Sequence, residues 1–172
     1  MTRRKVILYV AVSLDGYIAH DDGSIDWLAG EDTDPNHQTF YQQIDTTLMG
    51  RKTYEQIRSF PGEFPYRKTI NYVFSREKQQ SNEFVQFIND NVEEFVKRLK
   101  EEDGKDIWLI GGAQLNTTLL NVHLIDQMIV TIAPIILGKG IPLFTSQAIE
   151  QKLNYSDTQI LSDGYVQIKY TK

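Results

Sequence analysis

Three short polar segments of the sequence carry residue types that bind phosphate. Gly50–Thr53 has two cations and a hydroxyl, Ser75–Arg76 has a hydroxyl and a guanidinium, and Gly111–Gln114 opens with two glycines. Each follows a run of apolar residues that is typical of a buried strand. A glycine turn at a helix start exposes free backbone N–H groups, and phosphate is the usual ligand there. The alternative is that each segment is an ordinary strand-to-helix turn or a solvated helix start.

The residues between these segments predict the elements that position them. Strands are expected at Val6–Val12, Thr46–Met49, Thr69–Phe74, Phe84–Ile88, Asp106–Ile110 and Leu124–Ile132. Helices are expected at Asp34–Ile44, from Thr53, at Asn91–Glu102 with Asn91 as the cap, and after Gly112. The alternating stretches Thr158–Leu161 and Tyr165–Tyr170 predict a C-terminal hairpin. Strands that alternate with helices and finish in a hairpin predict one three-layer α/β/α domain over residues 1–172. Its central sheet is mainly parallel, with an antiparallel C-terminal edge hairpin.

The predicted sheet would bring the three polar segments together. In a parallel sheet the carboxyl ends of the strands share one edge, where ligands bind. One phosphate needs one such segment, so three of them indicate an elongated ligand with several phosphates, such as a dinucleotide. The patterns G-x-G-x-x-G and G-x-x-x-x-G-K-[ST] are absent. Their absence disfavours a doubly wound dinucleotide-binding domain and a P-loop NTPase.

Two segments outside the predicted elements have unusual composition. The stretch from Asp15 to about Thr33 has few signals of regular structure and carries Trp27. Long loops inside compact domains are often functional. The apolar run Ile135–Leu137 is too hydrophobic for a free loop, so we expect it to pack internally or to form a subunit interface.

The composition excludes several classes of function. The chain has 172 residues, a hydrophobic content of 41% and no cysteine. It therefore has no disulfide framework, no thiolate chemistry and no cysteine-ligated metal. The three histidines show no metal-ligand spacing, so no metal is expected. A net charge of −5 argues against a broad nucleic-acid surface, and no apolar run approaches membrane-spanning length. These features predict a cytoplasmic protein with a small-molecule ligand and no nucleic-acid or membrane partner.

Two of the polar segments resemble signatures of a known enzyme family. Met49–Glu55 resembles the M-G-R-x-T-[WY]-E signature of dihydrofolate reductases, and Ile110–Ala113 resembles their I-G-G-[GA] signature. A more specific similarity is to the reductase domain of the bifunctional riboflavin-biosynthesis deaminase/reductase. It rests on Ser13–Gly16, Asp126, Ala133–Pro134 and Gly138–Gly140. The similar segments run in the same order over nearly the whole chain, which is most similar to short stand-alone bacterial members of this superfamily.

The resemblance implies NADPH as cofactor and a set of residues that hold it. Ala11 would hold the nicotinamide carboxamide through backbone groups, with Ile18 against the ring. The residues expected at the phosphates and the adenosine are Gly50, Arg51, Lys52, Thr53, Ser75 and Arg76, with Gly111, Gly112, Ala113, Gln114 and Leu115 around the pyrophosphate. Arg76 with Ser75 would meet the 2′-phosphate that distinguishes NADPH from NADH. The resemblance also implies that the Gly111–Gly112 peptide bond is cis.

The substrate half of the site follows less directly from the resemblance. Dihydrofolate reductases place one carboxylate on the first helix, and Asp34 fits that position, whereas an alignment anchored on Phe40 puts Asn36 there. Asp34 followed by Pro35 is also typical of a plain helix cap. Asp15 is the alternative acid, although in the family it more often shapes the loop. Trp27, Phe40 and Thr131 are expected at the substrate, and Asn116 departs from the aromatic residue of strict dihydrofolate reductases.

Three functions follow as expectations. The first is an NADPH-dependent reductase of a pterin-like or ribosylaminopyrimidine-like heterocycle, with 5-amino-6-(5-phosphoribosylamino)uracil reduction as the first specific candidate. Against this candidate, the chain lacks a deaminase domain. The second is a true dihydrofolate reductase, and the third is an NADPH-binding sensor or scaffold without catalysis. The related riboflavin reductases are dimers, so a homodimer is also expected.

Overall fold

The computed structural model describes residues 3–28 and 34–172, so the end of the predicted 15–33 loop lies outside the described residues. The elements, in chain order, are β1 (Val6–Ser13), β2 (Tyr17–Ala19), α1 (Asn36–Gln43), β3 (Ile44–Gly50), α2 (Arg51–Ser59), β4 (Ile70–Phe74), β5 (Gln86–Ile88), α3 (Val92–Leu99), β6 (Asp106–Gly111), α4 (Ala113–Asn121), β7 (Gln127–Ala133), β8 (Ile141–Pro142), β9 (Asn154–Ile160), the 3-10 turn η2 (Ser162–Gly164) and β10 (Val166–Thr171).

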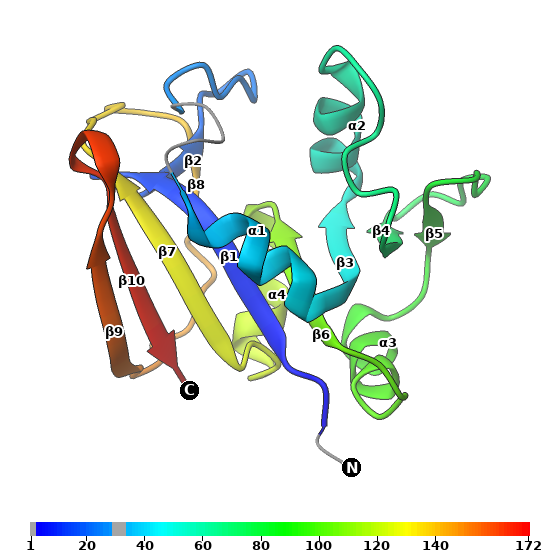
Figure 1. Ribbon diagram of the computed structural model, residues 1–172. Coiled ribbons are helices and arrows are strands. Elements are labelled where there is room, and N and C mark those ends of the chain that lie inside the picture. Colours follow the sequence, from blue (N-terminus) through cyan, green and yellow to red (C-terminus); the bar gives the residue numbers. More distant parts are fainter. Residues whose placement is uncertain (1–2, 29–33) are drawn as a thin grey trace.

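An eight-stranded sheet forms the centre of the molecule, in the order β5-β4-β3-β6-β1-β7-β10-β9 (Figure 1). The strands from β5 to β7 pair in parallel, whereas β10 runs antiparallel to both of its neighbours, β7 and β9. The predicted mainly parallel sheet with an antiparallel edge hairpin is therefore confirmed. The apolar runs are explained by burial on both faces, as in β1, where six of the eight residues are buried.

Helices cover both faces of this sheet, as Figure 1 shows for α1 and α4. Alternate residues of β1 point to opposite faces. Val6 and Leu8 join the core beneath α3 and α4, and Ile7 and Tyr9 join the core beneath α1. A third cluster around Tyr54 packs α2 against β3 and β4. The three-layer α/β/α prediction is confirmed.

Two local predictions were wrong in detail. The stretch from Asp15 to about Thr33 was expected to be a long loop with few signals of regular structure, yet within it β2 pairs antiparallel with β8 from the Gly-rich segment near residue 140. These strands have three and two residues, so neither gives a readable alternation in sequence. The helix expected from Asp34 begins at Asn36, because Asp34 and Pro35 form its lead-in.

Candidate active site

The three phosphate-compatible segments lie side by side at the carboxyl edge of the sheet. Gly50, the last residue of β3, is paired in register with Phe74 at the end of β4, so Ser75 follows beside it. On the other side of β3, Met49 is paired with Gly111 at the end of β6. The predicted meeting of the three strand ends is thus confirmed. We call Gly50–Thr53, Ser75–Arg76 and Gly111–Leu115 the phosphate cradle.

Two helix N-termini open onto the phosphate cradle. Gly50 precedes α2 and Gly112 precedes α4, and no described side chain caps either helix. A Cβ atom at Gly112 would lie 3.3 Å from Thr53 Oγ1 and 4.0 Å from Ile18 Cδ1, so these predicted cofactor residues converge. The Gly111–Gly112 peptide bond is cis, as the resemblance implied. Uncapped backbone N–H groups, a hydroxyl and glycines without side chains fit a pyrophosphate.

Two of the three cations of the phosphate cradle, Arg51 and Arg76, contact partners from the chain itself. Arg51 Nη1 lies 2.6 Å from Glu77 Oε2, and Arg51 Nε lies 3.5 Å from Glu55 Oε1. Arg76 Nη2 donates to Gln114 Oε1 at 3.4 Å, which links the β4 end to α4. Ser75 Oγ donates to the Glu77 carbonyl oxygen at 2.8 Å, and Lys52 is exposed. Arginine and lysine with a serine hydroxyl match the donor set of a phosphorylated ligand.

A row of residues joins the phosphate cradle side of the sheet to a polar cluster. Ala11 of β1 is paired with Thr131 of β7, Thr131 with Gln167 of β10, and Gln167 with Gln159 of β9. Ala11 is a predicted cofactor residue and Thr131 a predicted substrate residue. The register therefore puts the two halves of the expected site next to each other.

The polar cluster is centred on Asp34, just before α1. Tyr9 Oη of β1 donates to Asp34 Oδ2, and Gln167 Nε2 donates to the same oxygen at 2.9 Å. Gln167 Nε2 also lies 3.2 Å from Tyr9 Oη and 3.0 Å from Thr131 Oγ1. Asp34 Oδ1 accepts the Asn36 backbone N–H at 3.0 Å. Asp34 thus accepts the first N–H of α1 from the residue before the N-cap, Pro35, and also serves as the acceptor of a larger network.

Burial raises the pKa of Tyr9 above its ordinary value, and the hydrogen bond and negative charge of Asp34 raise it further. The hydrogen bond from Gln167 acts in the opposite direction. Since a raised pKa keeps a phenol protonated, Tyr9 can donate to Asp34 throughout the physiological pH range.

Asn36, the alternative key residue, belongs to the same network. Its Nδ2 donates to Gln159 Oε1 at 2.7 Å and to Gln167 Oε1 at 3.4 Å. The two candidates for the key position on the first helix, Asp34 and Asn36, therefore both contact Gln167. Neither Tyr9 nor Gln167 was singled out from the sequence. The one signal for Gln167 was a polar residue on the inward side of an alternating strand.

Asp15 shapes a loop. Its Oδ1 accepts from Ser13 Oγ at 2.7 Å, and its two oxygens accept the backbone N–H groups of Leu137 at 3.1 Å and Gly138 at 2.7 Å. The Ser13 hydrogen bond, aided by those from Leu137 and Gly138, holds the pKa of Asp15 below its usual range. A carboxyl with these contacts is a poor proton donor, so the geometry favours Asp34 over Asp15.

The predicted aromatic substrate residues lie in packed surroundings. Phe40 is only 4% exposed, and its ring stacks on Tyr9 with centroids 4.3 Å apart. It belongs to the core between α1 and the sheet, and its expected contact with the substrate stays a prediction. Trp27 is partly buried against Ala133, Leu161 and Tyr165. Its Nε1 is buried and has no hydrogen-bond partner among the described residues.

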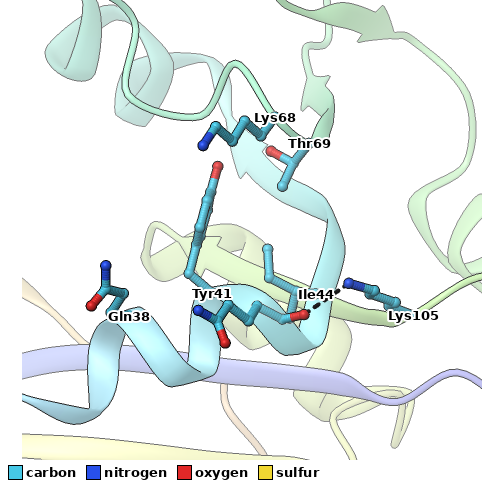
Figure 2. A pocket seen from close by; sticks show the side chains of 7 residues that line it. Gln38, Tyr41, Ile44, Lys68, Thr69 and Lys105 are labelled. Atoms are coloured by element: carbon cyan, nitrogen blue, oxygen red, sulfur yellow. Dashed lines mark hydrogen bonds between the residues drawn. The ribbon is translucent and has the colours of Figure 1, made fainter.

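A cavity of about 290 Å³ lies at the other end of β3, away from Gly50 (Figure 2). Its lining residues are Gln38, Tyr41 and Gln42 of α1, with Ile44, Lys68, Thr69 and Lys105. Lys105 Nζ donates to the Gln42 carbonyl oxygen at 2.9 Å, and the buried Tyr41 hydroxyl has no partner within residues 3–28 and 34–172. The lining carries two cations and no carboxylate, so the cavity favours an anionic group.

The described part of the chain offers no group of three or more metal-ligating side chains. Over the same residues, no helix has the length and apolar character needed to cross a bilayer.

Comparison with known proteins identifies the family. The family model for the RibD C-terminal domain matches residues 4–167. The chain belongs to the RibD C-terminal domain family. It is 43% identical to the Bacillus subtilis uncharacterized protein YwjB, over 98% of both chains. It is 39% identical to YyaP of the same organism, over 99% of this chain and 96% of the relative.

Solved structures agree with this assignment. A crystal structure from Shewanella sp. PV-4, named for riboflavin biosynthesis, superposes with a TM-score of 0.87 at 26% identity, over 97% of this chain and 98% of that one. Dihydrofolate reductase from Enterococcus faecalis, complexed with NADP(H), has a TM-score of 0.71 at 18% identity, over 97% and 95% of the two chains. The Thermotoga maritima deaminase/5-amino-6-(5-phosphoribosylamino)uracil reductase also has a TM-score of 0.71 at 18% identity, over 98% of this chain and 56% of that one. At 18% identity the last two show the fold alone.

Proposed function

We propose that this chain is an NADPH-dependent reductase of a pterin-like or ribosylaminopyrimidine-like heterocycle. The observation that carries the proposal is the convergence of three phosphate-compatible strand ends beside β1, whose Ala11 lies in one row with Thr131 and Gln167. A dinucleotide laid along these strand ends would run toward Asp34. This geometry, together with membership of a family with reductase relatives, supports hydride transfer beside Asp34.

The chain's own residues have separate tasks in this proposal. The phosphate cradle binds the pyrophosphate and the 2′-phosphate through backbone N–H groups and cations. NADPH supplies the hydride. Asp34 accepts an N–H of the heterocycle and orients its ring. The 290 Å³ cavity beyond α1 offers Lys68 to a phosphate or carboxylate extension of the substrate. 5-Amino-6-(5-phosphoribosylamino)uracil and dihydrofolate both carry such an extension.

Cofactor binding is the first experiment. NADPH and NADH are titrated against the fluorescence of Trp27 and Trp108, and NADPH is expected to quench it more tightly than NADH. If neither nucleotide binds, the reductase proposal and the sensor alternative both fail. If NADPH binds, its oxidation is then measured with 5-amino-6-(5-phosphoribosylamino)uracil and with dihydrofolate. Turnover of dihydrofolate alone favours a true dihydrofolate reductase, and binding without any turnover favours the sensor.

We also propose a homodimer. Leu14 and Ile136 are 64% and 69% exposed, and their loops are joined by a hydrogen bond from Leu14 N–H to the Ile135 carbonyl oxygen at 2.8 Å. Ile135 packs inward, so only part of the apolar run is covered within the chain. Sedimentation of the wild type and of Ile136→Glu tests this proposal. A dimer that the substitution dissociates supports it, and a wild-type monomer contradicts it.

A further inference from the structure

Two members of the Asp34 network are buried too deeply for a ligand to touch. Tyr9 is 7% exposed and Gln167 is 1% exposed. Both direct a hydrogen-bond donor to the same carboxylate oxygen, Asp34 Oδ2. Any effect of theirs on a bound substrate would therefore pass through a residue that they contact, and Asp34 is the partly buried residue that both contact.

The two oxygens of Asp34 are used unequally. Oδ2 takes the Tyr9 hydroxyl and the Gln167 amide, whereas among the described residues Oδ1 takes only the Asn36 backbone N–H at 3.0 Å. A carboxylate oxygen has two acceptor positions. As far as the described residues are concerned, Oδ1 therefore keeps one position for a ligand, and Asp34 itself is only partly buried.

The orientation of the Gln167 amide is itself determined. Its Oε1 accepts from Asn36 Nδ2 at 3.4 Å, so Nε2 is turned toward Asp34 and Thr131. Asn36 Nδ2 is anchored in turn on Gln159 Oε1 at 2.7 Å. The Gln167 amide has two N–H donors, which it can direct to Asp34 Oδ2 and Thr131 Oγ1, the two shortest of its contacts.

We propose that Gln167 and Tyr9 are positioning residues that hold Asp34 Oδ2, so that Oδ1 faces a ring N–H of the substrate. This inference rests on the proposed function, because it needs a heterocycle beside Asp34. The carboxylate torsion of an aspartate is broad, with no steep preference of its own. Without the Tyr9 and Gln167 contacts at Oδ2, the Asn36 backbone N–H at Oδ1 would be the one remaining restraint on the Asp34 carboxylate among the described residues.

The charged and titratable groups that face this cluster come from several elements. The His37 ring of α1 lies 5.8 Å from the Tyr9 ring, and Asp34 lies before the same helix. From the sheet the neighbours are the neutral Thr131 and Gln167, and Trp108 Nε1 donates to the Tyr9 carbonyl oxygen at 3.0 Å. Asp34 and His37 are therefore the ionisable neighbours of Tyr9 within the described residues.

A double-mutant cycle tests the proposal. Gln167→Met keeps the size and removes the donor, and Asp34→Asn removes the carboxylate. In the wild-type background Gln167→Met should lower kcat for the heterocycle by about 10- to 100-fold, the range for hydrogen bonds to charged groups. The dissociation constant of NADPH should stay within about twofold. In the Asp34→Asn background the same substitution should change kcat by less than about twofold. Equal losses of kcat on Gln167→Met in the wild-type and Asp34→Asn backgrounds would overturn the proposal.

Two further variants separate positioning from folding. Tyr9→Phe deletes one hydroxyl from the core and should show the same dependence on Asp34. Lys169→Met is the matched control, because Lys169 lies two residues along β10 from Gln167 and pairs with Asp157 rather than with Asp34 or Asn36. It should change kcat by less than about twofold, and a loss as large as that of Gln167→Met would contradict the assignment.

Crystal structures of the variants give a readout that needs no turnover. In Gln167→Met and Tyr9→Phe the Asp34 carboxylate should rotate away from its wild-type position, whereas in Lys169→Met it should stay. An unmoved carboxylate in both of the first two variants would overturn the positioning role. If the wild type reduces no heterocycle, the proposed function fails, and these structures still decide whether the two residues hold Asp34.

Discussion

The Arg51 guanidinium and the Glu77 carboxylate form an ion pair of 2.6 Å at the edge of the phosphate cradle. Glu77 lies just beyond Ser75, whose hydroxyl donates to the Glu77 carbonyl oxygen. Glu77 of the chain itself thus pairs with Arg51, the cation that the resemblance assigns to a cofactor phosphate. Binding of a phosphorylated cofactor would exchange one anion for another at Arg51.

This relationship predicts that Glu77→Gln tightens NADPH binding. The substitution removes a negative charge next to the phosphates and frees Arg51. Because the pair is solvent-exposed, we expect a gain of roughly two- to fivefold at low salt that shrinks as salt is added. Isothermal titration at two ionic strengths measures it. Glu93→Gln is the control, since Glu93 forms another solvent-exposed pair, with Lys97 on α3. Weaker binding by Glu77→Gln would show that the carboxylate helps to build the site.

Arg76→Ala should narrow the preference for NADPH over NADH. Arg76 reaches Gln114 at 3.4 Å in the cradle and is the residue that the resemblance assigns to the 2′-phosphate. Loss of a hydrogen bond to a charged group should cost NADPH about tenfold in affinity and leave NADH nearly unchanged. Fluorescence titration with both nucleotides measures the ratio. Arg58→Ala, at the exposed far end of α2, should leave the ratio unaltered. Equal losses for both nucleotides would remove Arg76 from that role.

The parts of the molecule that sequence analysis predicted depend on local patterns. Apolar runs ending in glycine marked β3 and β6. The predicted helix cap at Asn91 is confirmed, because its side chain accepts the Glu94 N–H at 3.1 Å. The phosphate cradle followed because strand ends of a parallel sheet must share an edge. A few residues of local sequence were enough for each of these predictions.

The network around Asp34 could not be predicted in the same way. Tyr9 is in the first strand and Gln167 in the last, and they meet because β7 and β10 line up beside β1 in one register. A register shift of one residue would point Gln167 to the other face. The burial of Phe40 in the core could not be predicted for a related reason. An eight-residue helix shows which residues share a face, but the surrounding fold decides whether that face meets the sheet or the ligand.

Gly111→Ala should destabilise the fold through a direct clash. A Cβ atom there would lie 2.9 Å from Asn116 Oδ1, and the residue has φ of 107°. The conformation and the overlap together should cost about 2–4 kcal/mol of unfolding free energy. Denaturant unfolding measures it. Gly62→Ala is the matched control, because Gly62 has φ of 106° and no atom within 4 Å of the added Cβ. Equal losses of unfolding free energy in Gly111→Ala and Gly62→Ala would show that the clash with Asn116 does not contribute to the destabilisation.

Tyr9 should make the protein sensitive to alkali. Burial raises its pKa above the ordinary value, and the Asp34 hydrogen bond adds to the effect. Above about pH 10 the unfolded chain loses the Tyr9 proton while the native state keeps it. The stabilisation of the fold by protonated Tyr9 is therefore complete below pH 10 and is lost as pH rises toward the pKa of Tyr9 in the native state. One proton corresponds to about 1.4 kcal/mol of unfolding free energy per pH unit.

Urea unfolding of the wild type and of Tyr9→Phe between pH 8 and pH 11 isolates this effect, because the other tyrosines titrate in both proteins. The wild type should lose unfolding free energy more steeply above about pH 10, by up to about 1.4 kcal/mol per unit relative to the variant. Below pH 9 the two curves should run parallel, offset by the lost hydrogen bonds to Asp34 and Gln167. Parallel curves over the whole range would mean that Tyr9 ionises as readily in the native protein as in the unfolded chain. The hydroxyl would then no longer be a secure donor to Asp34.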